Sequence, residues 1–492
     1  MRAPERRRRL LARTLTAGAA LACFGLAPAD AQTPTAPPQR GWSFGGSFRL
    51  RQELWDWFEP AGGEHSYTFT ASVLKLNATR RTAHERIFFE LVQPTLIGLP
   101  GGASLPPPAG QLGLGAAYAD ANQGQDASLF VGQAYWEGSP FGSKDRLRLG
   151  RTEFSEGVEV QNPDPSLTWL HQERISQRLL GPFAFTHVSR RLDGLQFTAD
   201  RGRTRYTLAG GIPTRGAFDL NGMDTLPEVR YAYASVAAPF SRKKPSGDAR
   251  LFTLYYNDAR DVVKSDNRPL PARAADTEGI SLATFGGHAV QLWDLPTGRV
   301  DALLWAAGQV GEWGRLSHRA YAASAEVGYQ PKAVPLRPWI RLGLNRYSGD
   351  RNPADGAHET FFPVLNTPRI YARFPFFTLA NLNDTFVQLQ LRPGRKWNLR
   401  LDYHDLRLAD DNDLWYGGGG AFQDRPSFGL GGRPSGGNRD LARLLDLSTT
   451  YQPRRDTDLT LYIAYAAGGD VVGVTYRNVE GFYGYLELLR RF

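Results

Sequence analysis

The chain has 492 residues, of which 41% are hydrophobic, and its 58 basic and 49 acidic residues give a formal net charge of +9. No segment beyond the N-terminal leader supplies about 18 consecutive apolar residues, so the sequence excludes membrane-spanning helices. The leader contains six Arg and two acids, which leaves 52 basic and 47 acidic residues and a net charge of +5. A charge balance this mild does not indicate nucleic-acid binding.

Residues 1–31 predict a secretory signal peptide, because an Arg-rich start precedes a short apolar stretch and a small-residue cleavage site before Gln32. A membrane anchor is the alternative, but the apolar stretch is too short to span a bilayer. A lipoprotein signal at Cys23 is disfavoured, since Leu21 lies one place off the usual pattern. Cys23 is the only cysteine, so residues 32–492, which we expect to form one domain, contain no disulfide.

The next segment alternates apolar and polar residues. One face of residues 42–58 carries Trp42, Phe44, Phe48, Leu50, Leu54 and Phe58. The other face carries Ser43, Ser47, Arg49, Arg51 and Glu53. This period of two is typical of a strand with one apolar face, and residues 396–408 and 458–467 repeat it. A soluble β-sandwich also alternates, so the pattern alone leaves both classes open.

Reading the whole chain in this way predicts eighteen strands. They are residues 42–59, 66–79, 85–97, 128–138, 146–155, 183–199, 204–213, 228–239, 249–259, 278–293, 299–312, 316–329, 337–347, 384–391, 396–408, 440–451, 458–467 and 478–492. An even number of antiparallel strands is the rule for bacterial outer-membrane barrels.

The connections between these strands favour the membrane barrel. Every second connection is short and turn-like: 80–84, 139–145, 200–203, 240–247, 294–298, 330–335, 392–395 and 452–457. The others include long Gly- and Pro-rich loops at 98–127, 156–182, 348–383 and 409–439. Short periplasmic turns and long surface loops predict an all-β, 18-stranded antiparallel barrel in the outer membrane of a Gram-negative bacterium, with both termini periplasmic.

Aromatic residues near strand ends agree with this interpretation. Trp55, Trp57, Trp136, Trp293 and Trp313 lie where interface girdles are expected. Terminal Phe492 is the aromatic residue that such barrels present to the outer-membrane assembly machinery, which we therefore expect as a partner. The lipid bilayer is the second expected partner.

Charged residues on the polar strand faces would point into the barrel. They are Arg49, Arg51, Glu53, Arg146, Arg148, Arg190, Arg341, Arg400, Asp402 and His404. A barrel of eighteen strands is wide enough for an aqueous channel, and Arg rings in a channel select anions. Only seven of the 52 mature basic residues are Lys, which suits carboxylate or phosphate cargo, although codon usage explains the bias equally well. The alternative role for these charges is to hydrate and brace the pore.

The sequence contains no catalytic constellation. A His-Glu-x-x-His helix, a Gly-x-Ser-x-Gly elbow and a P-loop are all missing, so we expect neither an enzyme nor a cofactor. Asp411 and Asp413 are weak candidates for Ca²⁺ ligands, and a solvated acidic loop is the favoured interpretation. No other metal site is expected.

Several motifs together resemble the alginate export family of outer-membrane barrels. They are the Ser47-Phe48-Arg49-Leu50-Arg51 opening, the Leu147 to Phe154 strand with its Gly-Arg-Thr-Glu, the Ser189 to Leu195 segment, and Leu399 to Asp405 followed by Asp413 to Tyr416. The resemblance implies an eighteen-stranded barrel that exports an anionic uronic-acid polymer through an Arg-rich constriction. Carried over by motif, the candidate lining residues are Arg49, Arg51, Arg151, Glu153, Arg191, Asp193, Arg400 and Asp402. Turn 452–457 departs from the family, whose characterised exporters have a longer turn there.

We therefore expect a channel for an anionic polysaccharide or oligosaccharide of the alginate type. The alternatives are a porin for small anionic or sugar solutes, an outer-membrane lipid hydrolase, and an adhesin. Loop 98–127 is too long for a hairpin and is expected to fold over or into the pore. Arg433 and Arg439 are expected to be exposed outside the pore.

Overall fold

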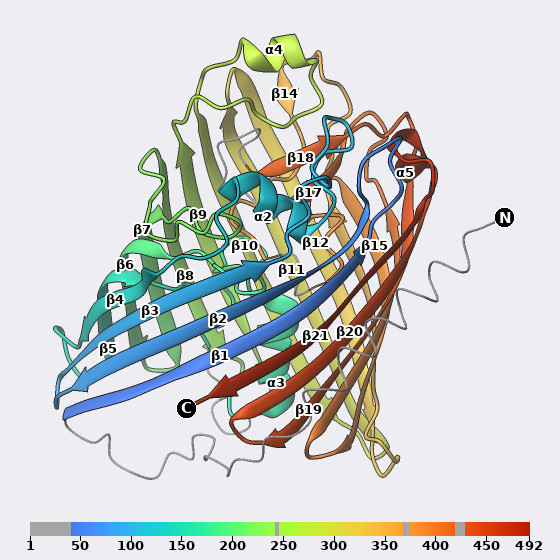
Figure 1. The fold of residues 1–492 in the computed structure, drawn as a ribbon. Coiled ribbons are helices and arrows are strands. Elements are labelled where there is room, and N and C mark those ends of the chain that lie inside the picture. The colour runs from blue at the N-terminus through green and yellow to red at the C-terminus, as the bar shows by residue number, and fades with distance from the viewer. Residues whose placement is uncertain (1–40, 161, 242–245, 368–370, 372, 419–428) are drawn as a thin grey trace.

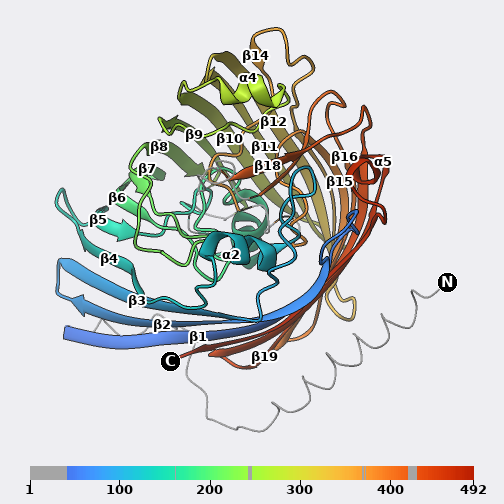
Figure 2. The same cartoon turned by 45° about the horizontal axis from the view of Figure 1, so that its top comes forward.

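In the computed structural model, which describes residues 41–160, 162–241, 246–367, 371, 373–418 and 429–492, eighteen strands close into one antiparallel barrel (Figures 1 and 2). Consecutive strands pair along the chain, and β21 (Glu480–Arg491) closes the ring by pairing with β1 (Gly41–Asp56). A two-residue strand, β14 (Ala357–His358), adds to β12 in parallel at one rim. The predicted strand count is confirmed, and the leader 1–31 lies outside the described residues.

The remaining barrel strands are β2 (Ser66–Arg81), β3 (Glu85–Ile97), β4 (Phe130–Gly138), β5 (Asp145–Thr152), β6 (Leu192–Arg201), β7 (Thr204–Pro213), β8 (Val229–Pro239), β9 (Gly247–Asp258), β10 (Ile280–Asp294), β11 (Gly298–Trp313), β12 (Leu316–Pro331), β13 (Trp339–Tyr347), β15 (Leu382–Gly394), β16 (Trp397–Arg407), β19 (Asp440–Arg454) and β20 (Thr457–Gly468). Outside the barrel sheet lie β17 (Trp415–Gly418), β18 (Leu430–Arg433), α2 (Leu114–Asn122), α3 (Pro165–Leu170), the π-helix η2 (His171–Ile175), α4 (Leu270–Ala274) and α5 (Asp470–Thr475). No helix among the described residues is long and apolar enough to span a membrane.

The two ends of the barrel differ. At one end, here called the turn end, neighbouring strands are joined by short hairpins such as the one between β19 and β20. The first and last strands also meet there, where Gly46 and Phe492 exchange backbone hydrogen bonds of 2.8 and 3.0 Å. At the opposite end, the loop end, the long connections gather (Figure 1). The asymmetry expected from the sequence is therefore present.

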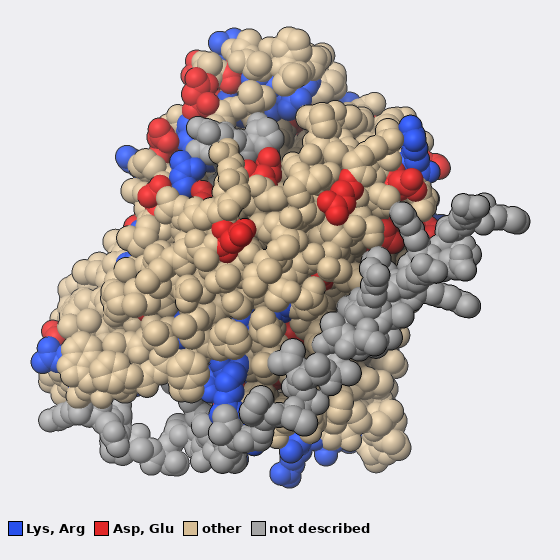
Figure 3. Space-filling model, in the orientation of Figure 1, with Lys and Arg blue, Asp and Glu red and all other residues tan. Residues whose placement is uncertain are grey.

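The barrel wall is apolar outside and polar inside. On β13, outward Leu344 is 59% exposed whereas inward Arg341 is 1% exposed, and β11 alternates in the same way around Leu304. This order is the reverse of a soluble sheet and suits a wall whose outer face contacts lipid. Figure 3 shows that the outer face over β1 to β3 has few charged residues across its middle, with charges mainly toward the two ends.

One segment departs from its expected structure. The pattern predicts a strand over 183–199, but β6 begins only at Leu192, and residues 183–191 turn into the barrel. Phe183 and Ser189 adopt φ angles of 54° and 64°, in the left-handed region that strands do not use. The alternation in this stretch does not mark a strand, so the expected start of this strand is wrong.

Residues 153–191, here called the plug, run from the loop end deep into the barrel. Asp164 caps α3 by accepting hydrogen bonds from the backbone N–H of Ser166 and Leu167, at 2.8 and 3.3 Å. The Asp164 carboxylate also pairs at 2.8 Å with Arg299, which lies at the turn end of β11. The plug therefore crosses most of the barrel length, and α3 lies low inside the barrel (Figure 1).

Loop 98–127 also enters the barrel, as expected. Its helix α2 lies within the rim of strands (Figure 2). Tyr118 of α2 accepts a 2.8 Å hydrogen bond from the backbone N–H of His187 in the plug, and Tyr67 on β2 donates to the Leu112 carbonyl at 2.8 Å. The loop thus fills the space between the plug and the wall of β1 and β2.

Candidate functional site

The interior of the barrel is the candidate site, and most of the predicted residues face it. The inward group comprises Arg49, Arg51, Glu53, Arg148, Glu153, Arg191, Arg341, Arg400, Asp402 and His404. Glu153 and Arg191 lie at the two ends of the plug, and the others come from strands on different sides of the ring.

Arg151 and Asp193 lie elsewhere. They pair with each other at 2.7 Å as direct cross-strand neighbours, and Asp193 shares its face with Leu195, which is 42% exposed on the outer wall. Residues three apart on a strand face opposite sides, so inward Arg148 and Arg151 cannot both face the interior. The structure therefore does not bring Arg151 and Asp193 to the lumen. The motif that suggested them carries no information about strand phase.

The first interior cluster joins β1, β21 and the plug. Arg51 contacts the Glu487 carboxylate through Nη2 at 2.6 Å and Glu53 through Nη1 at 3.3 Å. Arg49 donates to the plug carbonyls of Ala184 and Thr186 at 3.0 and 2.7 Å. Glu53 also accepts hydrogen bonds from Trp55 and Tyr483, at 3.0 and 3.2 Å. Arg49 thus holds the end of the plug, while Arg51 is saturated by acids.

The second cluster is the most cationic. Arg174 and Arg178 from the plug and Arg341 from β13 converge on Glu326 of β12, with N···O distances of 2.9, 3.5 and 3.4 Å. Arg341 is also paired with Asp301 of β11. All five side chains are buried, and the cluster has three guanidinium groups against two carboxylates.

Several guanidinium nitrogens in this cluster have no hydrogen-bond partner among the described residues. They are Arg174 Nη1, Arg178 Nε and Arg341 Nε, each buried. Buried N–H donors without acceptors are costly, by about 1–3 kcal/mol each. Donors of this kind are suited to the oxygens of an anionic ligand.

The third cluster lies on β15 and β16. Arg400 contacts Asp402 through Nε at 2.5 Å and Glu173 of η2 through Nη1 at 3.2 Å. His404 pairs with Asp384 at 2.9 Å through Nδ1. The plug is therefore tied to this side of the wall as well.

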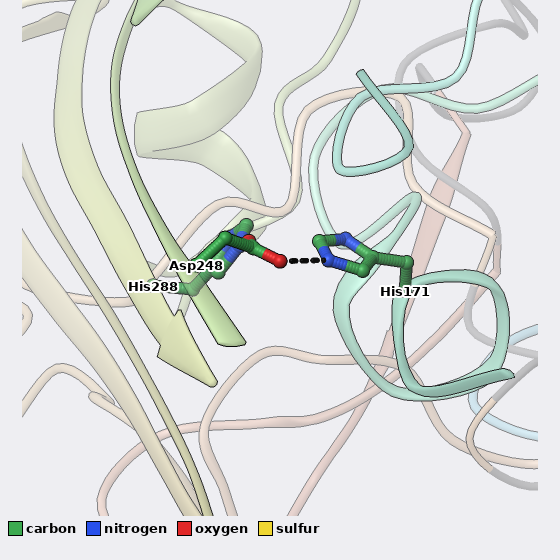
Figure 4. Close-up of side chains that lie close together, drawn as sticks. All are labelled: His171, Asp248 and His288. Atoms are coloured by element: carbon green, nitrogen blue, oxygen red, sulfur yellow. Dashed lines mark hydrogen bonds and ion pairs between the residues drawn. The ribbon is translucent and has the colours of Figure 1, made fainter. Parts of the chain in front are cut away.

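The fourth cluster fixes η2 to the opposite wall (Figure 4). Asp248 on β9 lies between two histidines, at 2.9 Å from His171 Nε2 of the plug and 3.1 Å from His288 Nε2 on β10. The other ring nitrogen of His171, Nδ1, lies 2.8 Å from the Gly157 carbonyl. Burial lowers the pKa of His171, but the contacts with Asp248 and the Gly157 carbonyl outweigh it. The pKa is therefore raised above its ordinary value, and the charged imidazolium is favoured.

Arg250 next to this triad is shared by two plug carboxylates. Its Nη1 lies 2.7 Å from Glu156 and 3.0 Å from Glu159. Glu159 also accepts hydrogen bonds from Tyr233 and, at 3.3 Å, from Ser235 on β8. Arg250 therefore binds the plug to the wall at β9.

Within the described ranges, two groups of three residues offer metal-type ligand atoms within 4.8 Å of one another: His171, Asp248 and His288, and Asp402, His404 and Asp446. The Ca²⁺ candidates Asp411 and Asp413 form no such group. Asp411 pairs with Arg439 at 3.2 Å, and buried Asp413 accepts hydrogen bonds from Thr360 and Tyr416 at 2.6 and 2.7 Å. Burial raises the pKa of Asp413 to about 6. The two carboxylates thus have separate partners.

Sequence reasoning missed Arg174, Arg178, Glu326, Asp301 and Glu487. Glu326 carried a usable signal, because it is an isolated acid at an inward position of an Ala-rich strand. The sequence signal for the plug arginines was weaker: the residues around α3 are unusually apolar for an exposed loop, which indicates that this segment is buried. Arg433, expected to be exposed, is instead buried, and it donates to the Ala109 carbonyl at 2.8 Å.

The sequence profile of the alginate export family, described as alginate export, matches residues 232–483. Among solved structures, the chain is similar to a BenF-like porin from Pseudomonas fluorescens Pf-5, with a TM-score of 0.55, 9% identity, and coverage of 92% of this chain and 98% of that one. It is also similar to the outer membrane protein OpdK from Pseudomonas aeruginosa, with a TM-score of 0.52, 10% identity, and coverage of 92% and 99%.

A third similar structure is OccK9 (OpdG) from Pseudomonas aeruginosa, with a TM-score of 0.51, 12% identity, and coverage of 91% and 98%. No curated protein sequence matches the chain. Identities this low support the fold alone, which is that of an outer-membrane β-barrel. The family profile covers half of the chain, including the wall strands that carry Arg250, Glu326, Arg341 and Arg400, and the chain belongs to the alginate export family.

Proposed function

We propose that this protein is a channel for an anionic saccharide, a uronate polymer or oligomer of the alginate type, and that its inward arginines bind the cargo carboxylates. In this proposal the leader 1–31 is removed, residues 32–492 form the channel, the turn end and both termini lie in the periplasm, and the loop end faces outward. It is no enzyme and needs no cofactor.

The observation that carries the proposal is the second cluster. Arg174, Arg178 and Arg341 outnumber their acidic partners and keep buried N–H donors without acceptors. A guanidinium fork binds a carboxylate through two hydrogen bonds, which matches the repeating group of a uronate. Neighbouring Glu326 prevents any single arginine from retaining the cargo, because it competes for the same donors.

The plug supports a second candidate, a porin for small anionic solutes. Trp169 of the plug packs against Trp339 of the wall at a centroid distance of 4.6 Å, and Asp164 pairs with Arg299 near the turn end. A segment that crosses the lumen and is anchored on several sides favours solutes of one or a few sugar units over a long polymer. Cargo length separates the two candidates.

Single-channel recording in planar bilayers tests both. In a KCl gradient, the reversal potential of the wild-type pore should indicate a preference for anions. The triple variant Arg174→Gln, Arg178→Gln, Arg341→Gln should lose that preference, whereas Arg443→Gln, on the outer wall of β19, should leave it unchanged. A cation-selective wild-type pore would contradict the proposal.

Blocking experiments then identify the cargo. Oligouronates added to one side should interrupt the current, and neutral maltooligosaccharides of equal length should not. Block that strengthens with chain length supports the polymer channel, and block by monouronate alone supports the small-solute porin. The pore-lining role of Arg49, Arg51 and Arg400 is tested by replacing them together with Glu. Arg439 is the exposed control for this change, since Arg433 is buried.

A further inference from the structure

The outer wall of the barrel carries two adjoining hollows on β9 to β15. The first, of about 900 Å³, is bordered by Leu251, Leu304 and Leu344, and its floor contains Ala306 and Ala323. The second, of about 580 Å³, lies nearer the loop end and is lined by Phe285, Tyr321 and charged side chains. Arg346 of β13 lines both hollows, so they form one groove with an apolar part and a charged part.

The groove opens to the outside of the barrel. Leu304 and Leu344 are 61% and 59% exposed, whereas the adjacent inward residues Trp305 and Asn345 are buried. A Cβ atom built on Gly308, which lies in the second hollow, would meet no other atom within 4 Å. The groove is therefore a depression in the lipid-facing surface that small residues leave between larger ones.

Three arginines surround the charged part. Arg319 pairs with Glu359 at 2.9 Å, and Arg351 lies 3.6 Å from Asp410, with both arginine side chains more than 70% exposed. Arg346 has no ion pair or hydrogen bond within the described part of the chain, and its guanidinium lies 5.9 Å from the Tyr321 ring centroid. The charged part thus has three guanidinium groups and two carboxylates, with one cation left uncompensated.

The position of this charge along the wall is informative. On β13 the outward residues run Ile340, Leu342, Leu344 and then Arg346. On β12 they run from Arg319 to Tyr321 and then to Ala323. In the strand register Arg346 pairs with Ala323, so β13 changes from charged to apolar nearer the turn end than β12 does. Tyr321 lies between the levels of Arg319 and Arg346, as an aromatic residue at a membrane interface does. The arginines therefore lie at the headgroup level, and the apolar part of the groove extends into the hydrocarbon region.

We propose that this groove binds a phosphorylated, acylated lipid of the outer leaflet, a glycolipid of the lipid A type. A phosphate lies among Arg319, Arg346 and Arg351, and one acyl chain lies in the groove over Ala306 and Ala323. Guanidinium groups bind phosphate oxygens through paired hydrogen bonds, and an acyl chain fills the apolar part of the groove through van der Waals contacts. The choice of leaflet rests on the orientation proposed above, with the loop end outward.

The test measures lipid binding by native mass spectrometry of the purified barrel in detergent, without any ion flow. Bisphosphorylated lipid A, added near equimolar amounts, should give a one-to-one complex. The variant Arg319→Gln, Arg346→Gln, Arg351→Gln should reduce the bound fraction at least tenfold, and Gly308→Phe, which fills the groove, should reduce it as well. Arg443→Gln is the matched control, because Arg443 is an exposed arginine on β19 outside both hollows.

Two further probes separate specific binding from ordinary lipid contact. Dephosphorylated lipid A should bind at least tenfold more weakly, and equimolar inorganic phosphate should not displace lipid A. Equal binding by the triple variant, equal binding of the dephosphorylated lipid, or displacement by phosphate would each overturn the proposal. Heat-modifiable migration on gels confirms that each variant barrel is folded. A negative result here leaves the channel recordings valid, since they do not depend on this groove.

Discussion

The wall and the plug are built on different principles. In the wall of β10 to β13, every strand pairs with its two neighbours, and each side chain faces lipid or lumen according to a period of two. In the plug, short helices and left-handed residues such as Gln177 alternate, and each segment is held by contacts with distant strands. The structure of the wall is specified by the local residue pattern and by backbone pairing. The structure of the plug is specified by ion pairs and packing contacts with residues far away in the sequence. The plug should therefore be removable and tunable while the wall persists.

Removal of the plug is the strongest test of this comparison. β5 and β6 are direct neighbours, so residues 157–187 can be replaced by a short Gly-Ser linker without altering strand pairing. We expect single-channel conductance to rise about fivefold or more, because the segment that crosses the lumen is gone. Planar-bilayer recordings measure the change. As a control, deletion of α4 (Leu270–Ala274), which has no buried residue, should leave the conductance unchanged. If deletion of the plug also left the conductance unchanged, the conduction path would avoid the plug.

Weakening the anchor of the plug should have the next largest effect. In Glu326→Gln, the carboxylate that Arg174, Arg178 and Arg341 share is lost, and three buried cations keep only Asp301 as an acidic partner. Breaking a buried ion pair on one side costs about 3–5 kcal/mol. We expect more frequent plug opening, seen as added current noise and faster protease cleavage within 153–191. Glu312→Gln, at an exposed position on β11, is the control, and equal noise in both variants would contradict the anchor.

Strand positions could be predicted from the sequence because a membrane barrel repeats one local rule. Leu399, Leu401 and Tyr403 face outward and Arg400, Asp402 and His404 face inward, as the alternation indicates. The same rule located inward Arg341 on β13. It applies wherever the backbone stays extended and each neighbouring residue changes face.

The plug could not be predicted in this way, because its structure depends on partners far away in the sequence. Residues 183–191 alternate like a strand, yet their backbone turns twice and their carbonyls bind Arg49. Glu173 finds Arg400 more than two hundred residues away. Arg151 and Asp193 were assigned to the pore by motif resemblance, which does not report strand phase, and the structure places them outside. Local pattern therefore gives the wall but not what fills it.

The smallest expected effect is a pH dependence of the plug. His171 and Asp248 form the contact between η2 and β9, with His288 and Arg250 as the neighbouring titratable or charged groups. The pKa of His171 is raised in the folded state, so its stabilising contribution is complete below the ordinary histidine value of about 6.5 and is lost as pH rises through the folded value. We expect plug opening, measured as current noise at fixed voltage, to increase modestly between pH 6 and pH 9. His171→Gln should abolish that change and keep the noise high at both pH values. A wild-type pore whose noise falls as pH rises would show that another group controls the plug, and that the wall contact at Asp248 does not depend on the proton of His171.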